Sequence, residues 1–312
     1  MIDKNAYAKI KEFFSGLVWP FTWLESRFTS VGLLVSIFLL MTVATVAGFL
    51  IIYAIPTGSD DSTYDSESSD TGGIDENCNA IGIEIRDCIA TYKPDAENNP
   101  PSDGLNYCDT ITSSEDVIWA IEEASSNSQI KALVLEIDSG GGSPVAADEI
   151  ASAVKNFGKP SIAWVRESAD SAAYWIASAA DTIIASENSD VGGIGVTTSY
   201  VDNAKQNLKD GLTYNQLTAG LYKDMGSSDK PLTATERSLI QRDLDILHQN
   251  FINAVATNRN LSVAKVTALA DGSTMLGAMA LRNGLIDQLG TKAEVWQKLE
   301  SDIGETPDVC WP

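Results

Sequence analysis

The sequence predicts an α/β domain with a mainly parallel sheet and a helical C-terminal part, preceded by one transmembrane helix. Three observations lead to this prediction. Between residues 80 and 197, apolar β-rich runs alternate with helical patterns, which is typical of successive strand-helix units. After residue 234 the apolar spacing is mainly helical. Ahead of both, residues 31–55 form an apolar run without a charge, which is longer than the ~30 Å hydrocarbon layer requires.

The run at 31–55 is predicted to be an uncleaved anchor rather than a signal peptide, because the run and the segment before it are both too long for a signal peptide. Four basic residues precede the run, and the next one after it is Arg86. The positive-inside rule therefore predicts a cytoplasmic N-terminal segment at 1–30 and an extracytoplasmic remainder. We expect a single-pass protein of the cell membrane, with the lipid bilayer as its partner along 31–55.

The composition of the chain after residue 55 indicates how the part beyond the membrane is organised. Residues 56–77 are acidic and rich in Ser, Asp, Gly and Thr, which predicts a solvated linker ahead of a folded domain at 78–312. The chain has 43 acidic and 21 basic residues, a net charge of −22, and no dense basic patch, so no nucleic-acid partner is expected. Four cysteines in the predicted outer part favour one or two disulfides, with three full pairings open. A catalytic cysteine is the less favoured alternative.

The elements of the outer domain follow in order. Strands are expected at 80–85, 130–137, 161–165, 182–185 and 193–197, with a further candidate at 213–218. Helices are expected at 115–124, 144–157, 234–257, 263–270, 276–282 and 292–299, and a short apolar helix reaches residue 180. Ser143 as N-cap, Pro144 at the first position and Gly158 after the end delimit the second helix. Gly284 ends the helix at 276–282.

A glycine-rich loop, Asp138 to Pro144, lies between a buried strand and the helix that Ser143 caps. Its three glycines allow backbone N–H groups to face one point near a helix N-terminus, which suits an oxyanion or a phosphate. Neither a P-loop nor a G-x-G-x-x-G spacing is present, so no nucleotide cofactor is expected. The single histidine, His248, excludes a multi-histidine metal site. A turn without a ligand is the alternative interpretation of this loop.

Ser171 opens the short helix after the strand at 161–165, and a serine there is most often only an N-cap. As a nucleophile it would have to point into a cleft, with the N–H of Ala172 helping to hold an oxyanion. His248, in the middle of a long helix, is expected on the helix surface or in packing. Lys223 could act as the base if burial lowered its pKa from ~10.4 toward ~7. An isolated lysine is more often a solvated surface residue.

Together these segments resemble the signal peptide peptidase A (SppA) family of membrane-anchored Ser-Lys peptidases, which have a ClpP/crotonase-like fold. The resemblance covers about residues 80–299 and lies in five segments in the family's order: 138–143, 174–181, 192–196, 220–224 and 271–290. It implies that Ser171 is the nucleophile and Lys223 the general base. It also implies that Gly141 and Ala172 supply the N–H groups of the oxyanion hole.

The sequence departs from the family at three places. Gly140 stands where proline is usual, and Ala172-Ala173 stand where two glycines are usual. Gly193 replaces a serine whose hydroxyl commonly contacts the lysine, so Lys223 would need another partner, such as Thr197, Thr198 or a water. The family also implies that nucleophile and base meet across a protomer or repeat boundary. With one copy of the motifs, this chain is expected to form a homo-oligomer.

The resulting expectation is a membrane-anchored serine endopeptidase with a Ser-Lys dyad and no cofactor. Its expected substrates are membrane-associated peptides such as remnant signal peptides. One alternative is a catalytically weak or inactive membrane scaffold of the same fold, which the departures at Gly193 and Ala172-Ala173 favour. Another is crotonase-like acyl-CoA chemistry, which fits poorly with a domain outside the cell.

Overall fold

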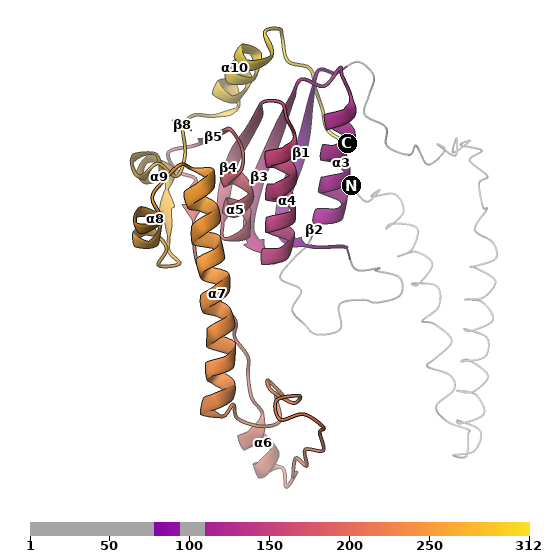
Figure 1. Cartoon of the computed structure of the whole chain (residues 1–312), viewed down its shortest axis with the longest axis vertical. Coiled ribbons are helices and arrows are strands. Elements are labelled where there is room, and N and C mark those ends of the chain that lie inside the picture. Colours follow the sequence, from indigo (N-terminus) through magenta and orange to yellow (C-terminus); the bar gives the residue numbers. More distant parts are fainter. Residues whose placement is uncertain (1–77, 94–109) are drawn as a thin grey trace, which may run out of the picture. The chain divides into compact units, whose positions relative to one another are not determined.

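The computed structural model of the chain describes residues 78–93 and 110–312, which belong to the unit Asp70–Pro312 (Figure 1). The predicted N-terminal segment, transmembrane helix and linker, at 1–30, 31–55 and 56–77, lie outside the described residues. Among the residues that are described, no helix is both long enough and apolar enough to span a bilayer.

A sheet forms the centre of the domain. Its order is β2-β1-β3-β4-β5-β8, with β9 beside β1 and with β6 between β4 and β7. Its strand pairs are parallel except for β6 with β7. This confirms the predicted α/β class with a mainly parallel sheet. The strands are β1 (Ala80–Ala90), β2 (Ile111–Ser113), β3 (Ala132–Gly142), β4 (Ser161–Asp170), β5 (Thr182–Ala185), β6 (Asp190–Gly192), β7 (Thr274–Leu276), β8 (Gln288–Leu289) and β9 (Val309–Cys310).

Helices cover both faces of this sheet, and the apolar run in β3 shows why. Side chains alternate between the faces of a strand. Leu133 and Leu135 pack with the helices α3, α4, α5 and α7, whereas Val134 packs on the other face with residues of α10. A strand buried on both faces has a nearly continuous apolar run, as Ala132 to Leu135 show here. The helices are α3 (Ser114–Ser126), α4 (Pro144–Asn156), α5 (Ala172–Ser178), α6 (Ala204–Lys209), α7 (Ala234–Asn258), α8 (Val263–Leu269), α9 (Gly277–Asn283) and α10 (Lys292–Ile303).

Local signals predicted the ends of two helices. The Ser143 side chain accepts a hydrogen bond from the N–H of Ala146, Pro144 is the first residue of α4, and Gly158 follows with a φ of +77°. Gly284 ends α9 in the left-handed conformation, with a φ of 80°. These caps are confirmed because they depend only on neighbouring residues.

Two predicted strands are wrong. Residues 193–197 are not a strand: β6 ends at Gly192, and the positive φ angles of Gly192 and Gly193 turn the chain away from an extended conformation. Residues 213–218 are exposed and have no neighbouring strand to pair with. Their apolar and β-branched content is therefore not sufficient to make a strand.

Residues 198–233, here called the arm, contain α6 and lie at the end of α7 that is remote from the sheet (Figure 1). None of the arm residues is buried. Large apolar side chains on the arm are exposed, including Leu217 at 95%. The others are Tyr200, Val201, Leu208, Leu212, Tyr214, Leu221 and Tyr222. The arm has no core of its own, so it does not gain stability from burial within one subunit.

A disulfide between Cys78 and Cys310 joins the residues just before β1 to the end of the chain, across a sequence separation of 232. Cys88 is also disulfide-bonded, and no cysteine in the described part of the chain is free. The prediction of disulfides is confirmed for the pair Cys78 and Cys310. This cross-link removes conformations from the unfolded chain and holds β9 beside β1.

Candidate active site

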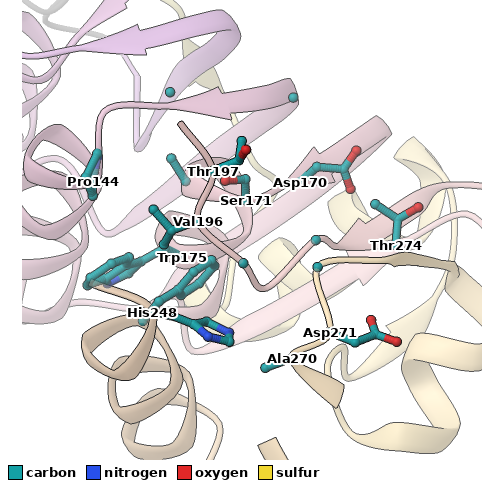
Figure 2. Close-up of a pocket in the computed structure, with 17 residues that line it drawn as sticks. Pro144, Asp170, Ser171, Trp175, Val196, Thr197, His248, Ala270, Asp271 and Thr274 are labelled. Carbon is teal, nitrogen blue, oxygen red and sulfur yellow. The ribbon is translucent and has the colours of Figure 1, made fainter. Parts of the chain in front are cut away.

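A cavity of about 740 Å³ lies where the carboxyl ends of β3 and β4 meet α5, α7 and the loop before β7 (Figure 2). The carboxyl edge of a parallel sheet is where such folds commonly bind ligands. Residues of five separate segments line it, including Gly140, Asp170, Ser171, Gly193, Thr197, His248 and Asp271. Two segments singled out in the sequence, the glycine-rich loop and the segment around Ser171, therefore share one cavity.

Ser171 has a conformation that is rare for a residue with a side chain. It stands at the junction of β4 and α5, and its backbone has a φ of 54° and a ψ of −123°. Its N–H donates to the carbonyl of Gly192, at 2.9 Å, and its carbonyl accepts from the N–H of Trp175, at 3.0 Å. The side chain makes no capping hydrogen bond to α5, although it stands at the N-cap position. The backbone is thus fixed in a strained form, which leaves the hydroxyl at the cavity.

Gly141 packs directly against Ser171. A Cβ at Gly141 would lie 2.8 Å from the Cβ of Ser171 and 3.0 Å from the nitrogen of Ala172, so a side chain does not fit there. The two predicted oxyanion donors are therefore close to each other and to the hydroxyl. In this structure the N–H of Gly141 donates to Ser139 Oγ, at 3.1 Å. An oxyanion would compete with this hydroxyl for the Gly141 N–H.

Lys223 is not brought to Ser171 within one subunit. Near the C-terminal end of α7, Phe251 stacks on Trp175 beside the cavity, with ring centroids 5.0 Å apart. Ala234, the first residue of α7, is 17 residues earlier, which corresponds to ~25 Å along a helix. Lys223 is exposed in the arm beyond that end (Figure 1).

Lys230, the other lysine in this part of the arm, has a structural role. Its Nζ lies 2.9 Å from Glu236 and 3.8 Å from Asp224. The hydrogen bond to Glu236 is the main cause of the raised pKa of Lys230. The same hydrogen bond, with those from Thr233, lowers the pKa of Glu236 to about 2. Lys230 is therefore held as a cation, whereas Lys223 is in no ion pair with a described residue.

Asp170, which comes directly before Ser171, also lines the cavity. Burial, and then the nearby charge of Asp190, raise the pKa of its carboxyl to about 6. One of its oxygens, Oδ1, is buried and has no hydrogen-bond partner. Gly193 is adjacent: a Cβ there would lie 3.1 Å from the nitrogen of Ser171 and 3.5 Å from the Cβ of Asp170. Gly193 therefore packs closely against both the nucleophile segment and Asp170, and a side chain there would be tight.

His248 lies in the cavity and not on the free surface of α7, where the sequence placed it as one alternative. Its Nε2 is buried without a hydrogen-bond partner. Figure 2 shows the imidazole separated from Ser171 in the view. One sequence signal could have placed His248 on the inner face of α7. It lies three residues before the buried Phe251, and residues three apart share a helix face.

Of the two hydroxyls predicted as partners for the lysine, Thr197 lines the cavity and Thr198 does not. Figure 2 shows Thr197 close to Ser171 in the view. Asp170 and Asp271 were not predicted as site residues. No local motif marks either one, since they meet only through the packing of β4 against β6 and of β6 against β7.

Fold and site together define an α/β protein with a strained serine beside a glycine-rich loop at the carboxyl edge of a parallel sheet. The family model for Peptidase family S49 matches residues 153–304, which include Ser171 and Lys223. The chain is 31% identical over 58% of its length to a Methanocaldococcus jannaschii protein named as a protease, of which 58% is covered. It is 31% identical over 61% of its length to Protease 4 of Haemophilus influenzae, of which 31% is covered.

The serine protease SPPA of Arabidopsis thaliana chloroplasts is 29% identical to the chain over 66% of its length, with 31% of the relative covered. The chain is thus similar to Peptidase family S49 over residues 153–304, and the resemblance to signal peptide peptidase A is confirmed. The first three relatives are covered over 58%, 31% and 65% of their own lengths.

Solved structures give a weaker likeness. The 1510-N membrane-bound stomatin-specific protease, in a mutant form, has a TM-score of 0.45 at 14% identity, with 75% of this chain and 98% of that chain covered. A mutant ClpP1 of Listeria monocytogenes has a TM-score of 0.43 at 13% identity, with coverages of 68% and 92%. The α/β fold is established by the sheet order described above.

Proposed function

We propose that the chain is a membrane-anchored serine endopeptidase that hydrolyses membrane-associated peptides such as remnant signal peptides. The observation that carries the proposal is Ser171, which is held in a strained conformation at the cavity beside Gly141 and Ala172. The match to the model of Peptidase family S49 over residues 153–304 supports the same activity. In this proposal residues 1–30 are cytoplasmic, 31–55 span the membrane, 56–77 are a linker and 78–312 form the extracytoplasmic peptidase domain.

In the proposed mechanism, neutral Lys223 takes the proton from Ser171 Oγ while the oxygen attacks a peptide carbonyl. The N–H groups of Ala172 and Gly141 then stabilise the oxyanion. The protonated lysine gives its proton to the leaving amine, which releases the C-terminal product and leaves an acyl-enzyme. Lys223 next takes a proton from water, which attacks the ester carbonyl. The ester bond then breaks, Lys223 returns the proton to Ser171 Oγ, and the N-terminal product leaves as a carboxylic acid.

The arm supports a base that comes from a neighbouring subunit. The arm, which contains Lys223, lies at the end of α7 that is remote from the sheet (Figure 1). The arm exposes many apolar side chains and has no buried residue, which is typical of a surface that another subunit covers. We therefore propose a homo-oligomer in which the arm of one copy delivers Lys223 to the cavity of the next.

Hydrolysis of a labelled peptide by the full chain in lipid nanodiscs tests the proposal. Ser171→Ala and Lys223→Ala are each expected to lower kcat/KM by several orders of magnitude. Lys155→Ala, an exposed residue of α4 outside the arm, is the matched control and should keep activity near that of the wild type. Unchanged hydrolysis in the Ser171 and Lys223 variants would contradict the proposed dyad.

Mixing the two inactive variants tests whether the base comes from a neighbour. If Ser171 and Lys223 meet across an interface, co-assembled subunits contain ~1/4 intact sites by random pairing. The mixture should then recover activity, whereas each variant alone stays inactive. No recovery in a mixed oligomer would show that the dyad forms within one subunit.

The alternative function, a membrane scaffold without catalysis, is favoured by Gly193 and by the distance of Lys223 from the cavity in one subunit. A fluorophosphonate probe separates the two functions. A peptidase should be labelled at Ser171, with labelling lost in Lys223→Ala. A scaffold should not be labelled at all.

A further inference from the structure

Asp170 has no role in the mechanism above, yet it is next to the nucleophile and lines the same cavity. Its Oδ1 is buried without a hydrogen-bond partner in the described part of the chain. Buried carboxyl oxygens are normally hydrogen-bonded or paired with a cation, because burial without a partner is costly. Within one subunit, this carboxyl therefore lacks the donor that such a position calls for.

The cavity that Asp170 lines is the place where a donor could enter. A Cβ at Gly193 would lie 3.5 Å from the Cβ of Asp170, 3.1 Å from the nitrogen of Ser171 and 3.6 Å from Cγ2 of Thr274. Glycine leaves this position without a side chain, although the resemblance implies a lysine-contacting hydroxyl there. Asp170 is thus the polar side chain on the edge of a space that also borders the backbone of the nucleophile.

The charges around this space are negative. Asp190 on β6 lies close enough to raise the pKa of Asp170, and its carboxylate accepts from Thr274 Oγ1, at 3.4 Å. In the loop before β7, Ser273 hydrogen bonds hold the pKa of Asp271 below its usual value, so that carboxylate is ionised. Among the described residues that line the cavity there is no lysine and no arginine. A cation entering from another copy would be attracted here.

We propose that Asp170 is a positioning residue: its carboxylate accepts a hydrogen bond from the Lys223 amine of a neighbouring copy and holds that amine beside Ser171. This inference rests on the proposed function. It assigns to Asp170 the contact with the lysine that, by the resemblance, a hydroxyl at position 193 would make. The carboxylate contacts the amine and not the substrate. Its second effect is electrostatic, because a negative charge beside the amine favours the ammonium form and raises the pKa of the base.

The pH profile of kcat/KM, measured on the full chain in nanodiscs, tests this role. Asp170→Asn keeps a hydrogen-bond acceptor and removes the charge, so the pKa of the lysine falls. The acid limb of the profile should move to lower pH by ~1 unit, as expected when an opposite charge within ~4–6 Å is lost. Asp148→Asn, an exposed carboxyl on α4, is the matched control and should not move the limb.

Two further variants separate positioning from a general loss of structure. Asp170→Ala should lower kcat at least tenfold with little change in KM, and Asp170→Glu, which keeps the carboxylate, should restore part of that loss. An acid limb that stays in place in Asp170→Asn, in an enzyme that still depends on Ser171, would overturn the assignment. Dependence on Ser171 is the control that tests the proposed function itself.

Carbodiimide cross-linking provides a readout that does not need activity. It joins a carboxylate and an amine in direct contact, so the oligomer should yield a linked peptide pair that contains Asp170 and Lys223. Such a pair must come from two copies, because Lys223 is remote from the cavity of its own subunit (Figure 1). Absence of this pair from wild-type oligomers, where other intersubunit links form, would also overturn the proposal.

Discussion

At the scale of single residues, close packing fixes the nucleophile. Gly141 has a φ of +108°, and a Cβ there would lie 2.8 Å from the Cβ of Ser171. Gly140, one residue earlier, has nothing within 4 Å of a Cβ. Two adjacent glycines of one loop thus differ in their tolerance of a side chain, although the sequence gives no sign of the difference.

This difference predicts opposite results for two alanine substitutions. Gly141→Ala combines backbone strain with a clash against Ser171, so it should destabilise the domain by ~1–3 kcal/mol and abolish labelling of Ser171. Gly140→Ala is the matched control and should change the stability of the domain and the labelling of Ser171 only slightly. Thermal unfolding and probe labelling of the two variants measure the effects. Equal behaviour of the two would mean that Gly141 does not pack as described.

The raised pKa of Asp170 predicts how stability depends on pH. Because its folded pKa is about 6, above the unfolded value of ~3.9, the folded state binds the proton more tightly. Stability contributed by the protonated form is therefore present below pH ~4 and is lost as pH rises through 6. For dissociated subunits, Asp170→Asn should raise the Tm at pH 7 by a few degrees and by much less at pH 4. A Tm difference that grows as the pH falls would contradict this assignment.

At the scale of elements, what could be predicted from sequence depends on the range of the interactions. The start of α4 follows from Ser143 and Pro144 alone, and β5 was predicted at its observed bounds because its apolar residues stand in a short run between turns. The strand predicted at 213–218 failed because pairing needs a neighbouring strand, which is a property of the whole sheet.

The site follows the same rule. Ser171 and the glycine-rich loop could be placed together from sequence, because both follow adjacent parallel strands. His248 was not predicted, because α7 brings it to the cavity through long-range packing. Asp170 ends β4 directly before Ser171, but no local signal gave it a role. The position of Lys223 in the assembly depends on a second chain, which no pattern within one sequence specifies.

The link between the arm and α7 is an ion pair at the helix start. Glu236 accepts from Thr233 in a capping box and from Lys230 Nζ at 2.9 Å. Glu236→Gln weakens both interactions, so hydrogen exchange of residues 224–236 should become faster, while β3 keeps its protection. Gln241→Glu, at an exposed position further along α7, is the control and should leave the exchange of 224–236 unchanged. Equal exchange in wild type and Glu236→Gln would show that the ion pair does not order the arm.

At the scale of the whole molecule, the domain has two unlike parts. The sheet and its helices are stabilised by cores on both faces and by the disulfide between Cys78 and Cys310. The arm exposes apolar side chains and buries none. Stability of the subunit and assembly of the oligomer should therefore respond to different substitutions.

Leu217 provides the test, because it is 95% exposed and contributes nothing to the core of its own subunit. Leu217→Glu places a charge in the proposed interface, so it should shift the protein toward monomers, lower peptide hydrolysis at least tenfold and leave the Tm of the subunit nearly unchanged. Trp119→Glu, at an apolar side chain of α3 that is 56% exposed and outside the arm, is the matched control and should preserve assembly. Size-exclusion chromatography with light scattering, measured beside hydrolysis, reads both properties. A fully active monomer of Leu217→Glu would show that the base need not come from a neighbour, because one subunit alone would then complete the site.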